Sequence, residues 1–425
     1  MGLIVQKFGG TSVADATKIQ RAARRAIRTK LDGHQVVMVV SAMGKTTDEL
    51  IELAREVSPN PPRREMDMLM TTGEQVSIAL MAMAIDAAGH EAISFTGGQV
   101  GLITDAAHRR ARIQQIDADR IRQHLAAGKI VIVAGFQGIN AEGLIQTLGR
   151  GGSDLSAIAL ASAVGADLCQ ILTDVDGVYT ADPRVVPEAR KLPEVSYDEL
   201  LELASLGTKV MQSRSVEFAK KFGVVFEVRS SLNTNPGTIV TEEHQAMEAV
   251  VIRGVSIERS QARVTITGIP DEPGMSATIL GALAEAEINI DMIVSNIAHD
   301  GYARHSFTMH TNDLGRAQAA LKSVLANLGP EAAIETEAGI AKLSVVGIGM
   351  RSHSGIAAQL FKALGDAGIN IGMISTSEIK ISVTVDETRI EDAARVAHRA
   401  FELDTPPLPP CPPGSDSSRS AAPRT

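Results

Sequence analysis

The sequence has few aromatic residues, two cysteines and no excess of basic residues. Only 3% of its 425 residues are aromatic and none is Trp, so Ala, Val, Ile, Leu and Met must build most of the core. Cys169 and Cys411 provide neither a disulfide framework nor a cysteine metal site, which fits a reducing cytoplasm. The net charge of −9 argues against a broad nucleic-acid-binding surface, because such a surface needs clustered Lys and Arg.

Membrane segments and the standard nucleotide motifs are also missing. No signal peptide precedes the first apolar segment, and no apolar stretch of about 20 residues predicts a membrane span. Neither Gly-x-x-x-x-Gly-Lys-Ser/Thr nor a Gly-x-Gly-x-x-Gly after the first predicted strand occurs. These absences argue against P-loop NTPases and Rossmann dehydrogenases. We therefore expect a cytoplasmic protein that uses no membrane and binds no nucleic acid.

The start of the chain predicts a phosphate-binding turn. Leu3–Phe8 is an apolar run typical of a buried strand, and a helical pattern begins near Asp15. Two glycines, at positions 9 and 10, lie in the turn between them. Glycine lets backbone N–H groups approach a ligand closely, and Lys7 adds a positive charge. This combination suits a polyphosphate, but an ordinary strand-to-helix turn with a surface lysine explains the same residues.

Strands and helices alternate through the first half of the chain. An amphipathic helix is predicted near residues 15–30, and residues 36–40 are typical of a strand buried on both faces of a parallel sheet. Further helical and strand patterns occur at residues 74–88, 92–95, 116–127, 130–134, 155–164 and 170–172. The alternation predicts an open α/β sheet with its ligand crevice at the carboxyl ends of the strands.

Polar turns rich in small residues follow the predicted strands. They occupy residues 7–10, 41–47, 96–98, 135–140, 149–154 and 173–179. In residues 149–154, Arg150 can hold a carboxylate or phosphate through two hydrogen bonds, and Asp154 opens the next helix. An N-capped helix with a surface arginine accounts for the same pattern. Asp174 and Asp176 are spaced for magnesium or nucleotide binding, but Asp-Gly is also an ordinary turn.

The second half contains an internal repeat. Gly268 and Asn289 recur 81 positions later as Gly349 and Asn370, together with eight other matched pairs. Each copy reads strand, helix, strand, strand, helix, strand, which predicts two small domains and not a solenoid. The sequence leaves open whether the last helix, near residues 392–401, is followed by a strand from elsewhere in the repeat.

Together these motifs resemble aspartate kinase, a family of the amino-acid-kinase fold. The matching motifs, in the family's order, are Lys7-Phe-Gly-Gly-Thr-Ser-Val13, Val40-Ser-Ala-Met-Gly44, Thr72-Gly-Glu74, residues 149–154, residues 173–184 and Lys209. The repeat is similar to the paired ACT domains that sense amino acids. The resemblance implies an α/β, three-layer catalytic domain with a mainly parallel sheet at residues 1–245. Two α+β, ferredoxin-like ACT domains would follow at 262–336 and 342–404. Residues 405–425 are rich in Pro and Ser and are expected to form a disordered tail.

The resemblance implies transfer of a phosphoryl group from Mg-ATP to the side-chain carboxylate of L-aspartate, the first step of lysine, threonine and methionine biosynthesis. Because that carboxylate is ionised at pH 7, no general base is needed, and catalysis reduces to positioning and charge stabilisation. Lys7 would neutralise the transferring group, and Asp154 would orient Lys7. The residues expected to line the nucleotide are Lys7, Gly9, Gly10, Ser41, Thr173, Asp174, Tyr179, Asp182, Arg184 and Lys209, with magnesium bound through the ATP phosphates. The residues expected to hold aspartate are Ser41, Thr47, Glu74, Arg150 and Ser153.

The resemblance also implies feedback inhibition by lysine, threonine or both at the ACT domains. The residues expected near the effector are Asp271, Met275, Asp291, Ser295, Asn370 and Ile371. Ser295 stands where the family commonly has Gln, a departure that bears on the strength or identity of the inhibition.

Self-association through ACT domains is expected. Met247 lies between the two halves, where an internal start would give an α₂β₂ assembly, although an ordinary linker methionine fits equally well.

Two other functions share part of this pattern. A glutamate or acetylglutamate kinase would have the same fold, but the Lys-Phe-Gly-Gly-Thr-Ser start and the ACT pair favour aspartate. A non-catalytic amino-acid sensor would keep the repeat and lose site residues, whereas Lys7, Glu74, Arg150 and Asp154 are all present.

Overall fold

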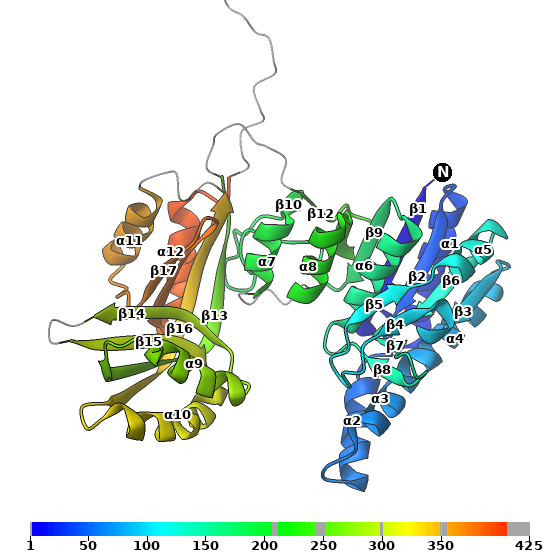
Figure 1. Ribbon diagram of the computed structural model, residues 1–425. Helices are drawn as coiled ribbons and strands as arrows, with labels where there is room; N and C mark the ends of the chain where they lie inside the picture. The colour runs from blue at the N-terminus through cyan, green and yellow to red at the C-terminus, as the bar shows by residue number, and fades with distance from the viewer. Residues whose placement is uncertain are drawn as a thin grey trace, which may run out of the picture.

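The computed structural model describes residues 2–205, 211–242, 251–297, 301–348, 350 and 355–405. It consists of an N-terminal α/β domain and a C-terminal half with two α+β units, which stand side by side in Figure 1. Lys209, Met247 and residues 406–425 lie outside the described residues, so what the sequence predicts for them stays a prediction.

The N-terminal domain is built on a sheet of eight strands. In spatial order they are β10 (Glu194–Ser196), β12 (Thr238–Thr241), β11 (Phe226–Ser230), β9 (Leu168–Thr173), β1 (Leu3–Phe8), β2 (Gln35–Val40), β6 (Ile130–Ala134) and β3 (Ala92–Phe95). The β11–β12 pair is antiparallel, and the other neighbours pair in parallel. The predicted mainly parallel sheet is confirmed.

Helices cover both faces of this sheet and complete three layers (Figure 1). On one face, α1 (Ala16–Leu31) and α4 (Thr72–Asp86) pack against Met38 and Ile132. The opposite face packs against four helices, namely α5 (Asp119–Ala126), α6 (Gly152–Val164), α7 (Tyr197–Ser205) and α8 (Ser213–Phe222). Val37 and Met38 point to opposite faces because side chains alternate along a strand, so both must be apolar.

A smaller sheet lies beside the large one. Its strands, in order, are β5 (Ile113–Ile116), β4 (Leu102–Thr104), β7 (Gln137–Ile139) and β8 (Ile145–Thr147), and α3 (Arg63–Met70) packs on β8 next to α2 (Thr46–Val57). A helix from residue 116 and a turn at residues 135–140 were expected from the sequence. The helix instead begins at Asp119, because the amide of Asp117 donates a hydrogen bond to the carbonyl of Gly101 and its carboxylate accepts one from the amide of Asp119. Residues 137–139 form a strand that pairs with β8.

One helical stretch of the described residues, Arg63–Asp86, is long and apolar enough for a membrane span by length and composition alone. A buried helix of a folded domain meets the same criteria. Met70, Ile78 and Met81 are buried in the N-terminal domain, and Glu74 on the same stretch is 3% exposed. Burial in the core accounts for part of its apolar character, whereas Val76 and Met83 on the same stretch are exposed.

The C-terminal half forms one antiparallel sheet shared by two α+β units. Its six strands, in order, are β14 (Ile290–Ile297), β15 (Tyr302–His310), β13 (Val251–Pro270), β16 (Ala333–Ile348), β18 (Lys380–Asp386) and β17 (Ile374–Thr376). The first unit packs α9 (Met275–Glu285) and α10 (Leu314–Leu328) on this sheet, and the second packs α11 (Ile356–Asp366) and α12 (Ile390–Ala400). The first repeat follows the predicted order of elements.

The last strand of the second unit comes from β13. The first part of β13 pairs with β16, from Val251 opposite Ile348 to Glu258 opposite Lys342, and its second part pairs with β15 of the first unit. The register shifts near Ser260, whose φ of 57° lies in the left-handed region. The strand that the sequence left open is therefore supplied from before the first repeat.

Candidate active site

A cavity of about 530 Å³ lies at the carboxyl ends of β1, β2 and β6, where the open-sheet rule places a ligand crevice. Eight of the predicted site residues line it, namely Lys7, Gly10, Ser41, Thr47, Glu74, Arg150, Ser153 and Asp154. Lys7 and Ser41 lie at the ends of β1 and β2, whereas Glu74 lies in the first turn of α4 and Asp154 in the first turn of α6. Strand ends and helix N-termini that are far apart in the sequence therefore meet at this cavity.

Lys7 and Asp154 form a charged pair in this cavity. The Nζ atom of Lys7 lies 2.5 Å from Oδ1 of Asp154, and the two side chains are 11% and 12% exposed. Lys7 is held near the end of β1 by pairing with β2 and β9, and Asp154 lies in the first turn of α6. A carboxylate is favourable at a helix N-terminus, and here it also fixes the direction of the ammonium.

Glycines shape the entry to α6. Gly151 has a φ of 72°, and a Cβ atom there would lie 1.9 Å from the side chain of Gln212. Gly149 has a φ of 81°, which also favours glycine. The tight path lets α6 begin directly at the cavity wall, so that Arg150 and Ser153 line it.

Glu74 presents an unused carboxylate oxygen. Its Oε1 accepts a hydrogen bond from the amide of Ala42 at 3.2 Å, whereas its Oε2 is buried and has no partner among the described residues. Burial raises the pKa of Glu74 to about 7. A buried carboxylate without a full set of partners is costly, and a bound ammonium group would relieve that cost.

The turn after β1 differs from its prediction in two respects. Residues Gly10–Val13 form a 3-10 helix, and Asp15 caps the separate helix α1 by accepting a hydrogen bond from the amide of Lys18. The amide of Gly9 donates to the carbonyl of Leu172 at 3.2 Å, so the sheet already uses the N–H that was expected to bind phosphate. Gly10 lines the cavity, and a Cβ atom there would lie 2.9 Å from the carbonyl of Ala42.

The other residues predicted to bind nucleotide do not line this cavity. Thr173 is the last residue of β9, and Asp174, Tyr179, Asp182 and Arg184 lie on the segment that follows it. The hydroxyl of Thr173 donates to Asp174 at 3.1 Å. Arg184 forms an ion pair with Asp182 at 2.7 Å, and this hydrogen bond lowers the pKa of the Asp182 carboxyl. Their assignment to the nucleotide stays a prediction.

The predicted effector residues do not share one cavity in a single chain. Asn370 lines a cavity of about 380 Å³ in the second unit, whose charged lining residues are Arg263, Glu337, Asp386 and Arg389. Ile371 follows Asn370 and packs against the core of that unit. Asp291 pairs with the buried Lys342. Asp271, Met275 and Ser295 belong to the first unit and are absent from the lining of this cavity.

Sequence reasoning missed two parts of the site. Arg109 lines the active-site cavity, and its φ is 69°. Asp67 is fully buried in α3, where it accepts a hydrogen bond from Thr147 at 2.6 Å and lies 2.7 Å from Nδ1 of His108. This network holds the loop that carries Arg109. The run His-Arg-Arg-Ala-Arg at residues 108–112 was the available signal, since closely spaced cations can bind an anionic ligand.

Comparisons with known proteins agree with this architecture. Residues 2–229 match the Amino acid kinase family, and residues 262–329 and 343–401 match ACT domains. An aspartate kinase of Stutzerimonas stutzeri is 50% identical over 96% of this chain and 98% of the relative. An aspartokinase of Pseudomonas aeruginosa is 51% identical over 96% of this chain and 99% of the relative.

A solved structure extends the match to three dimensions. The crystal structure of E. coli aspartokinase III in complex with aspartate and ADP is 25% identical, with a TM-score of 0.76 over 94% of this chain and 99% of that one. Sequence, domain order and fold thus lead to one conclusion: the chain belongs to the aspartate kinases, which use ATP to phosphorylate L-aspartate.

Proposed function

We propose that L-aspartate accepts the phosphoryl group of ATP in the 530 Å³ cavity, with its side-chain carboxylate as the nucleophile. The observation that carries this proposal is that the Lys7–Asp154 pair and the unpartnered oxygen of Glu74 line the same cavity. One group offers positive charge to a phosphoryl group, and the other offers negative charge to an ammonium. An amino acid that reacts at its side chain needs both.

Three groups would hold aspartate. Glu74 binds the ammonium through Oε2, and Arg150 and Ser153, which line the same cavity, bind a carboxylate. Thr47 at the start of α2 closes the pocket. The E. coli aspartokinase III complex with aspartate and ADP supports this choice of ligands.

Lys7 would stabilise the charge that develops on the transferring phosphoryl group. Asp154 keeps the ammonium in place before the reaction, so little reorganisation is needed when charge develops. The nucleotide would extend from Gly10 and Ser41 toward Thr173, Asp174, Tyr179, Asp182, Arg184 and Lys209. Magnesium would enter with the nucleotide through its phosphates, and among the described residues no cluster of three His, Cys, Asp or Glu could hold a metal ion.

Feedback inhibition by lysine, threonine or both is part of the same proposal. The 380 Å³ cavity beside Asn370 is lined by Arg263, which pairs with Glu337, and by Arg389 and Asp386. Groups of both charges are thus at hand for the two ends of an amino acid. A structure of E. coli aspartokinase III in complex with lysine and aspartate supports lysine as an effector. Self-association through the ACT domains and a cytoplasmic location complete the proposal.

Release of ADP with aspartate, with glutamate and without an amino acid tests the substrate. We expect ADP release that depends on aspartate and saturates with it. Equal release with glutamate would favour a related carboxylate kinase. If no amino acid stimulates ADP release from protein that binds ADP, a non-catalytic sensor is favoured instead.

A further inference from the structure

Residues 179–186, here named the nucleotide segment, pack into the regulatory half of the molecule. The segment belongs to the N-terminal domain and carries Tyr179, Asp182 and Arg184, the residues proposed to line the nucleotide. Yet Val185 and Val186 are buried in the same hydrophobic cluster as Leu343 and Ala394 of the second ACT unit. The position of this segment therefore depends on the regulatory half.

The backbone of the segment is anchored at Thr180. Its amide donates to the carbonyl of Arg190 at 2.8 Å, and its hydroxyl accepts the amide of Arg190 at 2.9 Å. The amide of Val255 in β13 donates to the carbonyl of Thr180 at 2.7 Å. Thr180 is fully buried, so these hydrogen bonds are shielded from water.

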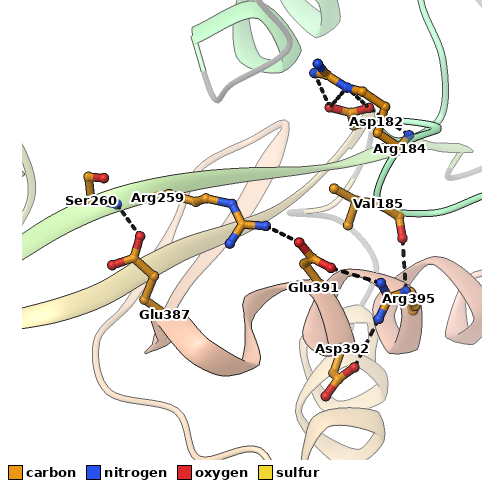
Figure 2. A network of polar contacts seen from close by, with 9 residues as sticks. All are labelled: Asp182, Arg184, Val185, Arg259, Ser260, Glu387, Glu391, Asp392 and Arg395. Carbon is orange, nitrogen blue, oxygen red and sulfur yellow. Dashed lines mark hydrogen bonds and ion pairs between the residues drawn. The ribbon is translucent and has the colours of Figure 1, made fainter.

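Helix α12 adds two polar contacts to the same segment. Nε of Arg395 donates to the carbonyl of Val185 at 2.9 Å (Figure 2). Nε2 of His398 lies 2.9 Å from the hydroxyl of Thr180, and His398 is 2% exposed. The two side chains are three residues apart on α12, which places them on one face of the helix.

The guanidinium of Arg395 is held by its own helix before it reaches the segment. It pairs with Asp392 at 3.1 Å and with Glu391 at 3.0 Å, and Glu391 also accepts a hydrogen bond from Arg259 in β13 (Figure 2). Half-exposed ion pairs of this kind are individually weak. Their joint effect is to fix the direction of the Nε–H bond toward Val185.

The other end of α12 borders the 380 Å³ cavity. Asp386 and Arg389 line that cavity immediately before the helix begins at Ile390. An eleven-residue helix is about 16 Å long, so one short, rigid element borders both the cavity and the nucleotide segment. A small cavity of about 30 Å³ is lined by Ala394 of the helix, Val185 of the segment and Val255 of β13, where the three elements meet.

We propose that helix α12 positions the nucleotide segment, and that Arg395 and His398 are positioning residues for nucleotide binding. Neither residue lines the active-site cavity. Arg395 holds the backbone at Val185 and His398 holds the side chain of Thr180, on either side of Asp182 and Arg184. This inference rests on the proposed placement of the nucleotide along that segment. It predicts that a defect in these contacts weakens nucleotide binding and leaves aspartate binding unchanged.

Binding of Mg-ADP to the full-length protein, measured by calorimetry, tests the proposal. Arg395→Met keeps the aliphatic chain and removes the donor, and His398→Leu removes the buried partner of Thr180. Each should raise the Kd for ADP roughly three- to tenfold, the range expected for one lost hydrogen bond. The KM for aspartate and kcat at saturating ATP should stay within about twofold, and Arg395→Lys should restore part of the affinity.

Controls separate this inference from the proposed function. Arg399→Met alters an exposed residue of the same helix and should bind ADP normally. Arg184→Ala tests the nucleotide placement itself. A higher Kd for Arg184→Ala with normal binding by Arg395→Met and His398→Leu overturns the role of α12 alone. An unchanged Kd for Arg184→Ala overturns the placement and this inference together.

A purely structural role predicts a different pattern. In that case aspartate and ADP affinities would fall together, along with the melting temperature, and Arg395→Lys would give no rescue. That result would overturn the inference. Because Arg395 is partly exposed, Arg395→Met is expected to fold. If His398→Leu does not fold, the ADP affinity of Arg395→Met decides the question.

Discussion

The ammonium of Lys7 and the carboxylate of Asp154 face each other across the gap between β1 and α6, 2.5 Å apart and almost out of contact with water. Neither element could be moved without separating the pair. In a site with no need for a general base, this preorganised positive charge is the largest contribution that the protein is expected to make to the reaction.

Lys7→Ala should therefore lower kcat by roughly 10²- to 10³-fold, or about 3–4 kcal/mol, as for the loss of one preorganised charge-stabilising donor. Steady-state kinetics at saturating aspartate and ATP measure this change. Lys18→Ala in the same part of the chain is the control, since Lys18 is partly exposed and lies 3.9 Å from its partner Asp15. A near-normal kcat for Lys7→Ala would remove Lys7 from the mechanism.

Substitutions at Glu74 and Arg150 should separate the two substrates. If these residues hold the ammonium and carboxylate of aspartate, Glu74→Gln and Arg150→Met should raise the KM for aspartate roughly 10- to 100-fold, because each removes a charged hydrogen bond. ADP binding measured by calorimetry should change little. Glu52→Gln, on an exposed face of α2, serves as the control. A comparable loss of ADP affinity would show that these residues do not belong to the aspartate pocket.

The raised pKa of Glu74 gives a pH dependence of stability with a defined sign. Burial raises this pKa from 4.5 to about 7, so the folded protein holds a proton that the unfolded chain releases. The resulting stability is complete below pH 4.5 and is lost as the pH rises through about 7. The loss is on the order of 3 kcal/mol.

Melting temperatures of the wild type and Glu74→Gln between about pH 5 and 8 test this linkage. The variant should lack the part of the decline that Glu74 causes. Saturating aspartate should also flatten the decline in the wild type, because a bound ammonium favours the ionised carboxylate. Parallel curves for the two proteins would show that Glu74 does not titrate in this range.

Lysine and threonine at millimolar concentration should lower activity, with a coupling of about 1–3 kcal/mol, or roughly 5- to 150-fold in affinity. Asn370→Ala should weaken the response because Asn370 lines the 380 Å³ cavity. Asn312→Ala, at an exposed position of the first unit, should leave it intact. Full activity of the wild type with both amino acids present would contradict feedback inhibition, and Ser295→Gln would then show whether that position abolishes the response.

Expression of the untagged gene should show whether a second product starts at Met247. Denaturing mass spectrometry of the purified complex would detect a fragment that begins there and contains the ACT pair. Such a fragment supports an α₂β₂ assembly, because an ACT unit exposes a sheet edge that another copy can cover. If only full-length chain is present, and Met247→Leu changes neither assembly nor inhibition, the enzyme is a homo-oligomer.

Short local motifs were sufficient to predict several of the residues that line the active-site cavity. The motifs around Lys7, Glu74, Arg150 and Asp154 predicted residues that meet in one cavity, although only Lys7 lies at the end of a parallel strand and Glu74 and Asp154 lie in the first turns of α4 and α6. The periodicity of residues 15–30 likewise predicted the buried stripe of α1. In both cases the prediction depends only on residues that are close together in the sequence.

Contacts between distant segments were beyond that reasoning. The amide of Gly9 is taken by Leu172, and only the pairing of β1 with β9 reveals this. Arg109 enters the cavity because Asp67 is 2.7 Å from His108, a contact across 41 positions that no motif encodes. The composition of β13 likewise does not predict that it belongs to both ACT units, because an alternation of apolar residues does not determine which strand is its partner.

The shared strands β13 and β16 constrain the order in which the chain can acquire structure. Val251 pairs with Ile348, so the beginning of β13 has no partner until the ribosome has made almost a hundred further residues. Contacts between such distant positions close slowly, because loop entropy is lost before the contact forms. We expect the ACT pair to fold as a single cooperative unit after synthesis of residue 348, and a chain truncated after the first repeat to leave half of β13 as an open, aggregation-prone edge.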